Sequence, residues 1–368
     1  MSRGAAGEQP PVRIGVIAGD GIGPELVESA VTVLRAVAAL GGPQLEYVDE
    51  AGGAATYMQT GEALTPGAIE RFRDEYAAVL KGPVGLPDVR RPDGTEAGLL
   101  GGLMRLGLDT FANVRPIRLL PGVQAPTRHQ PGAIDYVIVR ENTEGLYLSR
   151  GVGVVNARAA CDQLMMTREG VERVVRFSFD LARTRQGAPA DAVRRVTCVD
   201  KSNVLRSFAF FRSIFEEVAA EYPDIEADYR YPDAAAHDLV VDPARFDVLV
   251  MENFLGDILS DLGAGTVGGL GMCPSANIGH RSAYFEPIHG SAPSLAGQDQ
   301  ANPTSQILSA AMLLDHIGAP ESATRVRDAV AAAYADGAIV LMPDGRPNSG
   351  TRAVTDAIVQ RLSSVPQR

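Results

Sequence analysis

Two aspartates four residues apart are the first feature of this sequence that could do chemistry. Asp257 and Asp261 follow the apolar, β-branched stretch 246–251 and alternate with apolar residues at helical spacing. The stretch predicts a buried strand, and the spacing places both carboxylates on one face of a helix after it. Such carboxylates repel each other, but they are the ligands that Mg²⁺ and Mn²⁺ prefer. The pair therefore indicates either a metal site or a solvated helix face.

Three arginines lie on predicted elements close to their ends, where ligand sites form. They are Arg105 on a predicted helix over 99–108, Arg115 on a predicted strand over 111–120, and Arg140 at the end of a predicted strand over 134–140. The planar guanidinium fork binds carboxylates through paired hydrogen bonds, so three together suit a di- or tricarboxylate. Taken singly, each is more often a surface arginine.

Two further charged residues stand out by their surroundings. Lys201 follows a predicted strand over 194–199, at the carboxyl end where α/β sheets place their ligand sites. It is either an exposed charge or a group whose pKa is tuned for proton transfer. Asp233 lies in a stretch of small, apolar residues, where an unpaired carboxylate would be costly to bury.

A glycine-rich turn, 19–25, follows the first predicted strand, 12–18. Turns of this kind between a strand and a helix can hold a phosphate, although a lone glycine turn is weak evidence. Strands and amphipathic helices alternate onward to about residue 81, which predicts a mostly parallel α/β sheet. A long Gly/Pro-rich loop at 285–297 is of the type that usually carries function.

The composition bounds the class of protein. At 368 residues the chain exceeds the usual limit for one hydrophobic core, so two domains are expected. A net charge of -11 argues against nucleic acid and anionic membranes as the main partners. No apolar run approaches the ~20 residues that span a bilayer, and segment 1–11 lacks a signal-peptide pattern. Three cysteines without metal-ligand spacing fit a reducing, cytoplasmic setting.

Six short segments together resemble the isocitrate/isopropylmalate dehydrogenase family of metal-dependent, decarboxylating 2-hydroxyacid dehydrogenases. In chain order they are Gly-Asp-Gly-Ile-Gly-Pro-Glu (19–25), Asn-Val-Arg-Pro (113–116), Arg-Glu-Asn-Thr-Glu-Gly-Leu-Tyr (140–147), Asp-Lys-Ser-Asn (200–203), Asn-Phe-Leu-Gly-Asp-Ile-Leu-Ser-Asp (253–261) and Glu-Pro-Ile-His-Gly-Ser-Ala-Pro (286–293). Each is modest evidence alone, whereas six in order are specific. The resemblance extends from about residue 12 to residue 362.

The resemblance implies an α/β, two-domain fold like that of isopropylmalate dehydrogenase, with mixed sheets flanked by helices, and not a Rossmann dinucleotide fold. One domain, residues 1–110 with 268–368, would contain both termini and bind the cofactor. The other, residues 111–267, would form the contact of a homodimer. The active site would lie in the cleft between the domains and take residues from both subunits.

The family's roles map onto this sequence position by position. By resemblance, Arg105, Arg115, Arg140 and Asn203 would bind the substrate. Asp257 and Asp261 would hold Mg²⁺ or Mn²⁺ together with Asp233 of the partner subunit. Lys201 of the partner subunit would take the hydroxyl proton, and Tyr147 would protonate the enol. The cofactor pocket would be formed by Ile17, Glu286, His289, Gly290, Ser291, Ala292, Ser294 and Asn302.

The expected cofactor is NAD, with NADP as the alternative. Members of the family that use NAD usually carry an aspartate where this chain has Ser294. Isocitrate dehydrogenases that use NADP usually carry a lysine there, with a tyrosine motif near the C-terminus. This chain has neither pattern. NAD is expected because nothing obvious in the sequence offsets the desolvation of a 2′-phosphate.

The substrate prediction depends on the segment before Arg105, which contacts the C3 substituent in this family. Here it holds Gly98, Gly101 and Gly102, so we expect space but no apolar grip on an isopropyl group. Segments 82–88 and 118–123 also look most like tartrate/D-malate dehydrogenases. The sequence therefore predicts D-malate or tartrate as substrate. The alternative is 3-isopropylmalate dehydrogenase of leucine biosynthesis, or a homoisocitrate/isocitrate-type relative.

A more distant alternative is a non-catalytic regulatory subunit built on the same fold. Such subunits typically lose a catalytic group. This chain keeps Tyr147, Lys201 and the three aspartates, which favours an enzyme.

Overall fold

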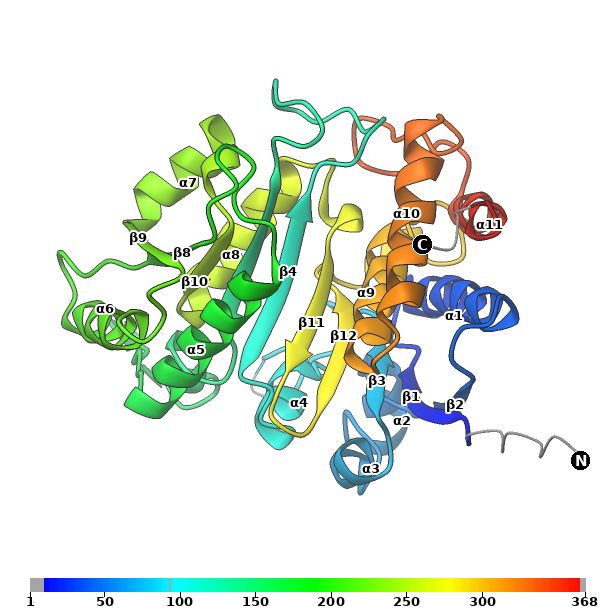
Figure 1. Cartoon of the computed structure of the whole chain (residues 1–368). Helices are drawn as coiled ribbons and strands as arrows, with labels where there is room; N and C mark the ends of the chain where they lie inside the picture. Colours follow the sequence, from blue (N-terminus) through cyan, green and yellow to red (C-terminus); the bar gives the residue numbers. More distant parts are fainter. Residues whose placement is uncertain (1–9, 93, 365–368) are drawn as a thin grey trace, which may run out of the picture.

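A mixed sheet of ten strands runs through the part of the chain that the structure describes (Figure 1). The structure is a computed structural model that describes residues 10–92 and 94–364, so most of segment 1–11 and the last residues of the predicted domain 1–110 with 268–368 lie outside it. The sheet order is β2-β1-β3-β12-β11-β4-β5-β10-β8-β9. The strands are β1 Val12–Ile17, β2 Leu45–Asp49, β3 Ala78–Lys81, β4 Ala112–Arg118, β5 Asp135–Glu141, β6 Val154–Val155, β7 Ala160–Cys161, β8 Arg195–Val199, β9 Glu226–Arg230, β10 Val248–Met251, β11 Pro274–Ile278 and β12 Ala283–Pro287.

Both ends of the sheet are parallel and its centre is antiparallel. Strands β2, β1, β3 and β12 pair in parallel, as do β5, β10, β8 and β9. In the centre, β11 pairs antiparallel with β12 and with β4, and β4 pairs antiparallel with β5. The parallel start and the mixed α/β class are therefore confirmed.

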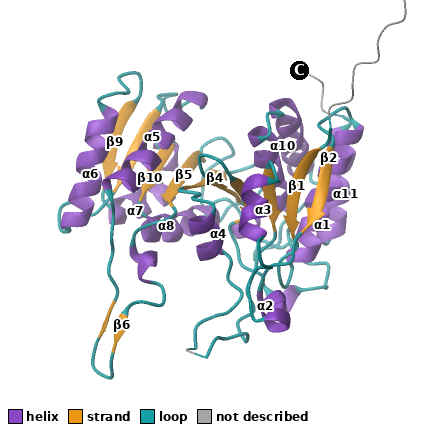
Figure 2. Cartoon of the chain, turned by 90° about the horizontal axis from the view of Figure 1, so that it is seen from below, coloured by secondary structure: helices purple, strands orange, loops and turns teal. Residues whose placement is uncertain are grey.

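Helices lie on both faces of this sheet (Figure 2). The α-helices are α1 Gly23–Ala39, α2 Ala54–Thr60, α3 Ala68–Asp74, α4 Gly101–Gly107, α5 Arg168–Thr184, α6 Arg206–Ala219, α7 Pro232–Val241, α8 Asn253–Gly265, α9 Thr304–His316, α10 Pro320–Ala335 and α11 Thr351–Leu362. Short 3-10 turns are η1 Leu146–Ser149, η2 Pro243–Arg245, η3 Leu270–Met272 and η4 Pro293–Leu295. Among the described helices, none combines the length and the apolar character needed to cross a membrane.

The strand and helix around the aspartate pair form as predicted. Strand β10 is fully buried, and α8 begins two residues after it. The buried carboxylate of Glu252 caps α8 by accepting from Leu255 N at 3.2 Å. Its other oxygen accepts from Leu146 N at 3.1 Å, next to Tyr147. Glu252 therefore fixes both α8 and the turn that carries Tyr147.

One expected element boundary is wrong. The helix expected over 99–108 begins only at Gly101. Gly98 precedes it with φ +77°, and a Cβ there would overlap the backbone of Ala54. Gly98 is thus required for close approach to α2 and adds no space beside Arg105.

The glycine turn 19–25 does not form a phosphate cradle. The turn's own N–H groups of Asp20, Ile22 and Gly23 already donate to backbone carbonyls. The carboxylate of Asp20 is 3% exposed and bonds to donors outside the turn. It accepts from Ala54 N at 2.7 Å, Ala55 N at 2.9 Å and Gly85 N at 2.8 Å. This turn therefore ties α2 and the loop after β3 to the end of β1.

The two predicted domains correspond to opposite ends of the continuous sheet. Strands from residues 12–81 and 274–287 form one end, and strands from residues 112–251 form the other. The two ends meet where β11 pairs with β4. Their independence as domains stays a prediction.

A two-stranded hairpin, β6–β7, projects from the rest of the chain (Figure 2). It carries exposed valines, with Val152 74%, Val154 71% and Val155 76% exposed. Side chains of this type are seldom exposed in a group on an isolated protein, so the hairpin is suited to contact another surface.

Candidate active site

One face of the central strands carries a row of polar side chains. They are Lys81 on β3, Tyr284 and Glu286 on β12, Ser275 and Asn277 on β11, Asn113 and Arg115 on β4, Arg140 on β5, and Asn142 just after β5. Residues two apart in a strand share a face, which explains the pairs. The register places Asn277 opposite Asn113, and Asn113 opposite Arg140. The row therefore crosses the centre of the sheet.

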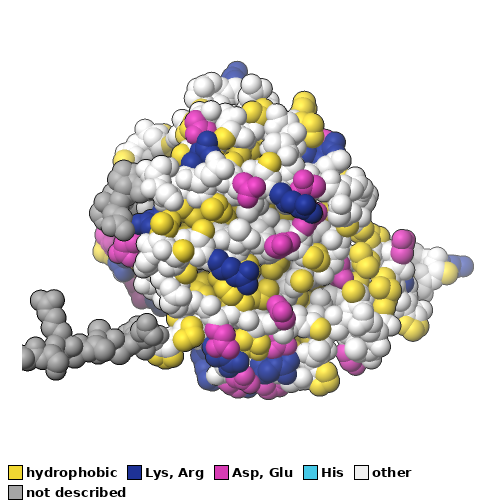
Figure 3. Space-filling model, turned by 90° about the vertical axis from the view of Figure 1, so that its right-hand side faces the viewer, with side chains coloured by type: hydrophobic (Ala, Val, Ile, Leu, Met, Phe, Trp, Pro, Cys, Tyr) yellow, Lys and Arg dark blue, Asp and Glu magenta, His cyan; other side chains and the backbone are white. Residues whose placement is uncertain are grey.

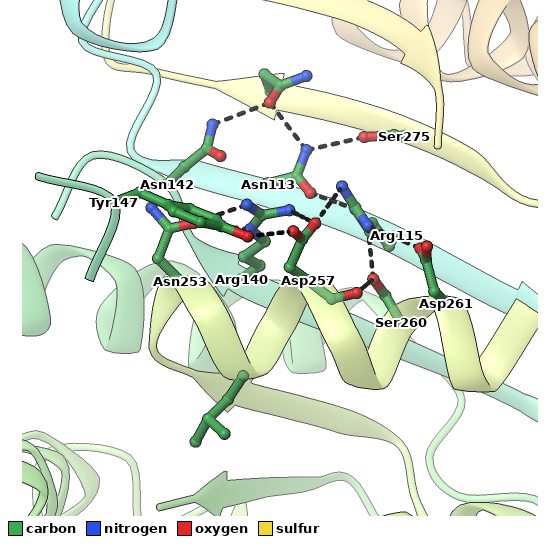
Figure 4. A network of polar contacts seen from close by, with 12 residues as sticks. Asn113, Arg115, Arg140, Asn142, Tyr147, Asn253, Asp257, Ser260, Asp261 and Ser275 are labelled. Atoms are coloured by element: carbon green, nitrogen blue, oxygen red, sulfur yellow. Dashed lines mark hydrogen bonds and ion pairs between the residues drawn. The ribbon is translucent and has the colours of Figure 1, made fainter. Parts of the chain in front are cut away.

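Asp257 is at the centre of a charged cluster against this row (Figure 4). Its carboxylate pairs with Arg140, lies 3.7 Å from the guanidinium of Arg115 and accepts from the Tyr147 hydroxyl at 2.7 Å. The arginine side chains are 2% and 6% exposed, whereas that of Asp257 is 36% exposed. Two of the three predicted substrate arginines are thus brought together with one predicted metal ligand.

The electrostatics of the cluster favour an anionic ligand. Burial and the guanidiniums of Arg105 and Arg115 lower the pKa of Arg140 to about 9, against the opposing effect of Asp257. Burial also lowers the pKa of Arg115. Burial disfavours the ionised form of Asp257, but Arg140 and Arg115 outweigh it and hold its pKa below the usual range. Positive charge is in excess, so a bound diacid would stabilise these arginines.

The second aspartate of the pair is less engaged. Asp261 Oδ1 lies 3.5 Å from Arg115, and its side chain is 52% exposed. Burial and the neighbouring Asp257 raise its pKa, while Arg115 opposes this. Two carboxylates on one helix face, one of them largely unpaired, fit a hard cation, which would relieve their repulsion. No cluster of three metal-binding His, Cys, Asp or Glu residues occurs in residues 10–92 and 94–364, so one chain brings together two of the three predicted ligands.

Lys201 and Asp233 pair with each other, apart from the cluster. Their side chains are 34% and 70% exposed, and the Lys201 ammonium lies 5.7 Å from the ring centre of Tyr231. The hydrogen bond from Lys201 lowers the pKa of Asp233. Asn203, in the same turn, is exposed. The described part of the chain therefore does not bring these three predicted residues to Asp257.

The turn that carries Lys201 is held by a buried ion pair that the sequence reasoning missed. Asp200 is 0% exposed and accepts from Arg212 Nε and from Ser202 N, each at 2.7 Å. Arg212 in turn lies over the ring of Tyr229 at 4.1 Å. The partly exposed Lys201 is thus carried by a turn that the buried Asp200–Arg212 ion pair holds in place.

The predicted cofactor residues lie at the other end of the polar row. Glu286 pairs there with Lys81, and their side chains are 15% and 2% exposed. Burial disfavours the ionised form of Glu286, but Lys81 outweighs it and lowers the pKa of the carboxyl. The Ser291 hydroxyl donates to the carbonyl of Gly85. The loop that holds Glu286 and Ser291 is thereby joined to the loop after β3.

Two predicted cofactor residues are buried in this structure, and their contact with the cofactor stays a prediction. Ile17 is fully buried in the core. Asn302 is 8% exposed, and its Oδ1 accepts from Thr304 N at 3.1 Å at the start of α9. Its amide group faces the hydroxyl of Tyr334 at 3.4 Å.

The remaining predicted cofactor residues are accessible on one loop. They are His289, Gly290, Ala292 and Ser294, all partly or fully exposed. His289 Nδ1 lies 2.9 Å from the Gly290 carbonyl, and burial lowers the pKa of its ring. Ala292 has φ 37°, which turns the chain sharply before η4. The loop therefore presents backbone groups and a neutral serine.

A cavity of about 550 Å³ adjoins the cluster. Its lining includes Arg105, Asn142 and Tyr147 together with a group of leucines, which we call the leucine wall. The wall consists of Leu99, Leu103 and Leu106, the last two 46% and 61% exposed. The expectation that this segment offers no apolar side chain is wrong, because Leu99 and Leu103 directly follow Gly98 and Gly102 and both line the cavity.

Several residues of this site were missed by sequence reasoning. They are Lys81, Asn142, Asn277 and Ser260, whose hydroxyl accepts from Arg115 at 2.6 Å. The strands gave a usable signal, since polar residues recur at every second position of otherwise buried strands. Ser260 gave none, because a serine on a helix is most often solvent-facing or back-bonded.

With this geometry in place, the comparisons with known proteins are consistent. The profile described as isocitrate/isopropylmalate dehydrogenase matches residues 13–358. The 3-isopropylmalate dehydrogenase of Corynebacterium glutamicum (strain R) is 42% identical over 363 residues, covering 96% of this chain and 100% of that protein. That of Frankia casuarinae is 44% identical over 334 residues, covering 88% of this chain and 93% of that protein. A solved isocitrate dehydrogenase from Methylococcus capsulatus superposes with a TM-score of 0.84 at 38% identity, covering 95% and 99%.

These relatives confirm the predicted family and correct the predicted branch. The similar proteins carry the name 3-isopropylmalate dehydrogenase, so the findings favour the alternative substrate over D-malate or tartrate. The leucine wall gives the physical reason, because it provides the apolar surface that the glycines seemed to remove. The chain belongs to the isocitrate/isopropylmalate dehydrogenase family and is an NAD(P)-dependent decarboxylating dehydrogenase.

Proposed function

We propose that the enzyme oxidises and decarboxylates 3-isopropylmalate with NAD and Mg²⁺ or Mn²⁺. The observation that carries this proposal is the leucine-lined cavity beside Arg105 and Tyr147. A malate core held by the arginines would direct its C3 substituent toward the leucines. Burying an isopropyl group there is favourable by about 25 cal/mol per Å² of apolar surface. The names of the similar proteins support the same substrate.

The arginines are suited to hold the two carboxylates of the malate core. Arg140 donates to Asn253 Oδ1 from Nε at 2.9 Å and from a terminal nitrogen at 2.8 Å. Arg115 donates to Asn113 Oδ1 at 2.6 Å. Guanidiniums fixed in this way lose little freedom when the ligand arrives, which favours a correctly oriented complex.

The metal would be held by Asp257 and Asp261 with Asp233 of the partner subunit. When bound, such an ion supplies Lewis-acid stabilisation of the charge that develops on the substrate oxygen. Asp257 is the counter-ion of Arg140 in this structure. Its transfer to the metal would leave the Arg140 guanidinium for a substrate carboxylate, so metal and diacid would favour each other's binding.

Two side chains would move the protons. Lys201 of the partner subunit would take the proton of the C2 hydroxyl, and bound NAD⁺ would supply the hydride acceptor. The bond from C3 to its carboxylate would then break, CO₂ would leave, and Tyr147 would give its phenolic proton to C3 of the resulting enolate. Burial and the hydrogen bond to Asp257 raise the pKa of Tyr147, which keeps the phenol protonated near neutral pH and able to act as the acid.

The proposed assembly is a homodimer with shared sites. Beside the aspartates, α8 exposes Phe254 (37%) and Ile258 (52%), which a second copy would cover. The β6–β7 hairpin and its exposed valines would add to the same contact. A second copy also supplies what one chain lacks, because Lys201 and Asp233 do not reach the Asp257 of their own chain.

NAD is the proposed cofactor. It would bind along the loop of His289, Gly290 and Ala292, near the accessible edge of Glu286. Ser294 is neutral and exposed. In the C-terminal loop, Arg346 is paired with Asp344 at 2.7 Å, so its charge is already partly offset. A 2′-phosphate would therefore gain little to compensate for its desolvation.

A second candidate substrate is an isocitrate-type acid, whose C3 substituent ends in a carboxylate. Arg91 and Arg150 line the same cavity, and both are exposed. An added Cβ on Gly102 would lie 3.4 Å from an Arg150 terminal nitrogen, so this guanidinium extends over α4. The similarity to a solved isocitrate dehydrogenase points in the same direction.

A substrate panel tests the proposal. Initial rates with 3-isopropylmalate, isocitrate and D-malate, each with NAD and Mn²⁺, should give the highest kcat/KM for 3-isopropylmalate. Leu103→Ala and Leu106→Ala should each lower kcat/KM for 3-isopropylmalate about 10-fold relative to D-malate, because apolar contacts to the isopropyl group are lost.

The matched control is Met58→Ala, because Met58 is 61% exposed like Leu106 but lies outside the cavity. It should leave the ratio unchanged. A preference for isocitrate that disappears in Arg150→Ala would establish the second candidate instead. Equal rates with D-malate and 3-isopropylmalate in the wild type would contradict the proposed substrate.

A further inference from the structure

A continuous line of buried polar side chains joins the cofactor end of the site to the substrate end. Lys81 pairs with Glu286, and Glu286 Oε1 accepts from Asn277 Nδ2 at 3.0 Å. Asn277 Oδ1 accepts from Asn113 Nδ2 at 2.8 Å, and Asn113 Oδ1 accepts from Arg115 Nε at 2.6 Å. The line therefore begins at a carboxylate and ends at a guanidinium proposed to bind substrate.

The two ends of this line determine how both amides are oriented. An ionised carboxylate can only accept a hydrogen bond, so Glu286 requires the NH₂ group of Asn277 to face it. The oxygen of Asn277 is then turned toward Asn113, which must present its own NH₂ group. This leaves the oxygen of Asn113 for Arg115, which can only donate. The acceptor on Asn277 thus keeps Asn113 in the orientation that holds Arg115.

Burial makes this orientation costly to change. Asn113 and Asn277 are both 0% exposed, so water is not an easy alternative partner. Rotating either amide by half a turn would place NH₂ against NH₂ or against the guanidinium of Arg115. Each buried donor left without an acceptor destabilises its arrangement substantially.

The same acceptor holds a second residue of the cavity. Asn277 Oδ1 also accepts from Asn142 Nδ2 at 2.9 Å, and Asn142 lines the cavity next to Tyr147. Asn277 itself is 0% exposed. One fully buried amide oxygen is therefore bonded to side chains that lead both to Arg115 and to the cavity wall.

We infer that Asn277 is a positioning residue for the diacid, whose side-chain oxygen fixes Arg115 through Asn113 and fixes Asn142 directly. This inference rests on the proposed function, since it takes Arg115 as a substrate ligand. It goes beyond that function because it assigns substrate affinity to a residue that touches no substrate. What counts at position 277 is an acceptor atom, not polarity or packing in general.

Two substitutions of Asn277 separate the acceptor from the packing. Asn277→Leu removes the acceptor at similar volume. Asn277→Asp keeps an oxygen toward Asn113 and Asn142, but it places a second carboxyl beside Glu286 at a fully buried position. Packing alone predicts that the aspartate variant is the more damaged in every respect. Positioning predicts that it binds diacid better than the leucine variant does.

The measurement is calorimetric titration of the full-length variants with 3-isopropylmalate, D-malate and isocitrate in the presence of Mn²⁺, with thermal unfolding recorded in parallel. We expect Asn277→Leu to raise the Kd of the diacid about 10-fold to 100-fold, as the loss of one or two buried hydrogen bonds would. We expect Asn277→Asp to raise it by no more than about 3-fold while having the lower Tm.

Ser275→Ala is the matched control. The Ser275 hydroxyl is the other acceptor of the Asn113 amide, at 2.8 Å, but a hydroxyl can donate as well as accept and does not fix the orientation. It should change the Kd less than about 2-fold. A folded Asn277→Leu with unchanged Kd, or an aspartate variant weakened as much as the leucine variant, would overturn the inference.

Two provisions keep the test decisive. If Asn277→Leu does not fold, Asn113→Leu and Asn113→Asp repeat the comparison one step nearer to Arg115, and equal Kd values for that pair count against the inference. A wild-type chain that binds D-malate or isocitrate but not 3-isopropylmalate contradicts the proposed substrate alone. The variants are then compared with the diacid that binds.

Discussion

The cluster around Asp257 and the pair formed by Lys201 and Asp233 are opposite in construction. The cluster is complete within one chain, with Arg140 and Arg115 buried beneath a carboxylate that two guanidiniums and a phenol already engage. The pair lies near the surface, and the described part of the chain does not bring it to Asp257. In the proposed site, a single chain therefore preassembles the substrate arginines and Tyr147, whereas the proposed base Lys201 and the third metal ligand Asp233 would come from a second chain.

The largest effect on activity should come from a substitution in the Lys201–Asp233 pair. Lys201→Met should lower kcat about 10² to 10⁴-fold, because a general base is lost, and hydride transfer itself should become slower. Tyr147→Phe should spare hydride transfer and slow protonation of the enol. Pre-steady-state absorbance of NADH separates the two steps. Near wild-type rates in both variants would show that neither residue transfers a proton.

Mixing two inactive variants tests whether the sites are shared. Hybrid dimers of Lys201→Met with Asp257→Asn contain one site with both defects and one site with none. An equimolar mixture, after unfolding and refolding together, should regain about a quarter of the wild-type activity, as random pairing in a symmetric dimer requires. Each variant refolded alone is the control. No recovery in the mixture would place Lys201 and Asp257 in the same chain's site.

The two aspartates of α8 should differ in what they do for stability. Asp257→Asn leaves the buried Arg140 without its counter-ion, which should destabilise the metal-free protein by about 1–3 kcal/mol, after allowance for the partial exposure of Asp257. Asp261→Asn should change stability by less than about 0.5 kcal/mol, because its contact with Arg115 is long and exposed. Urea unfolding in chelator measures both, and equal losses would contradict the difference in engagement.

Both aspartate variants should lose the response to metal. Mn²⁺ raises the Tm of a protein that binds it only when folded, and this rise should be present in the wild type and reduced in Asp261→Asn as well as in Asp257→Asn. Asp315→Asn is a suitable control, since that carboxylate pairs with Arg327 on the surface. A full Mn²⁺ response in Asp261→Asn would remove it from the metal site.

The smallest effect should come from a substitution in the cofactor loop, which belongs neither to the Asp257 cluster nor to the Lys201–Asp233 pair. Ser294→Asp adds a carboxylate where a ribose would lie, which accepts from its hydroxyls and repels a 2′-phosphate. The ratio of kcat/KM for NAD over NADP should rise about 10-fold, which is the effect of roughly one charge-assisted hydrogen bond. An unchanged ratio would mean that Ser294 does not face the ribose.

The sequence predicted the parts of the site that depend on local periodicity. The spacing of Asp257 and Asp261 was enough to place both on one face of α8, and the strands predicted over 111–120 and 134–140 correspond to β4 and β5. Strands β11 and β12 were not predicted, and the start of the expected loop 285–297 belongs to β12. The sequence could not reveal that Arg140 pairs with Asp257, because that contact depends on β5 lying beside β10 in the sheet. Strand order is set by the whole chain, and no single segment encodes it.

Two of the interpretations that failed share one cause, which is that a glycine pattern was interpreted locally. The turn at 19–25 was considered as a phosphate site, but its N–H groups donate to backbone carbonyls, among them that of Ser291, and its backbone packs against Ser291. Gly98 was interpreted as open space beside the substrate, but it meets the backbone of Ala54. A glycine signals that something approaches closely, and only the tertiary structure identifies what approaches.

The position of β12 has a consequence for how the chain is made. Strand β3 pairs with β1 on one side and with β12 on the other, yet about two hundred residues separate β3 from β12 in the sequence. During synthesis, the apolar edge of β3 therefore remains unpaired until nearly the whole sheet has been translated, and such edges promote aggregation. Lys81 ends that edge with a charge that stays unmatched until Glu286 emerges. In a nascent chain, the unpaired charge of Lys81 would thus disfavour edge-to-edge association of β3. Pairing with Glu286 would neutralise that charge once β12 has been made.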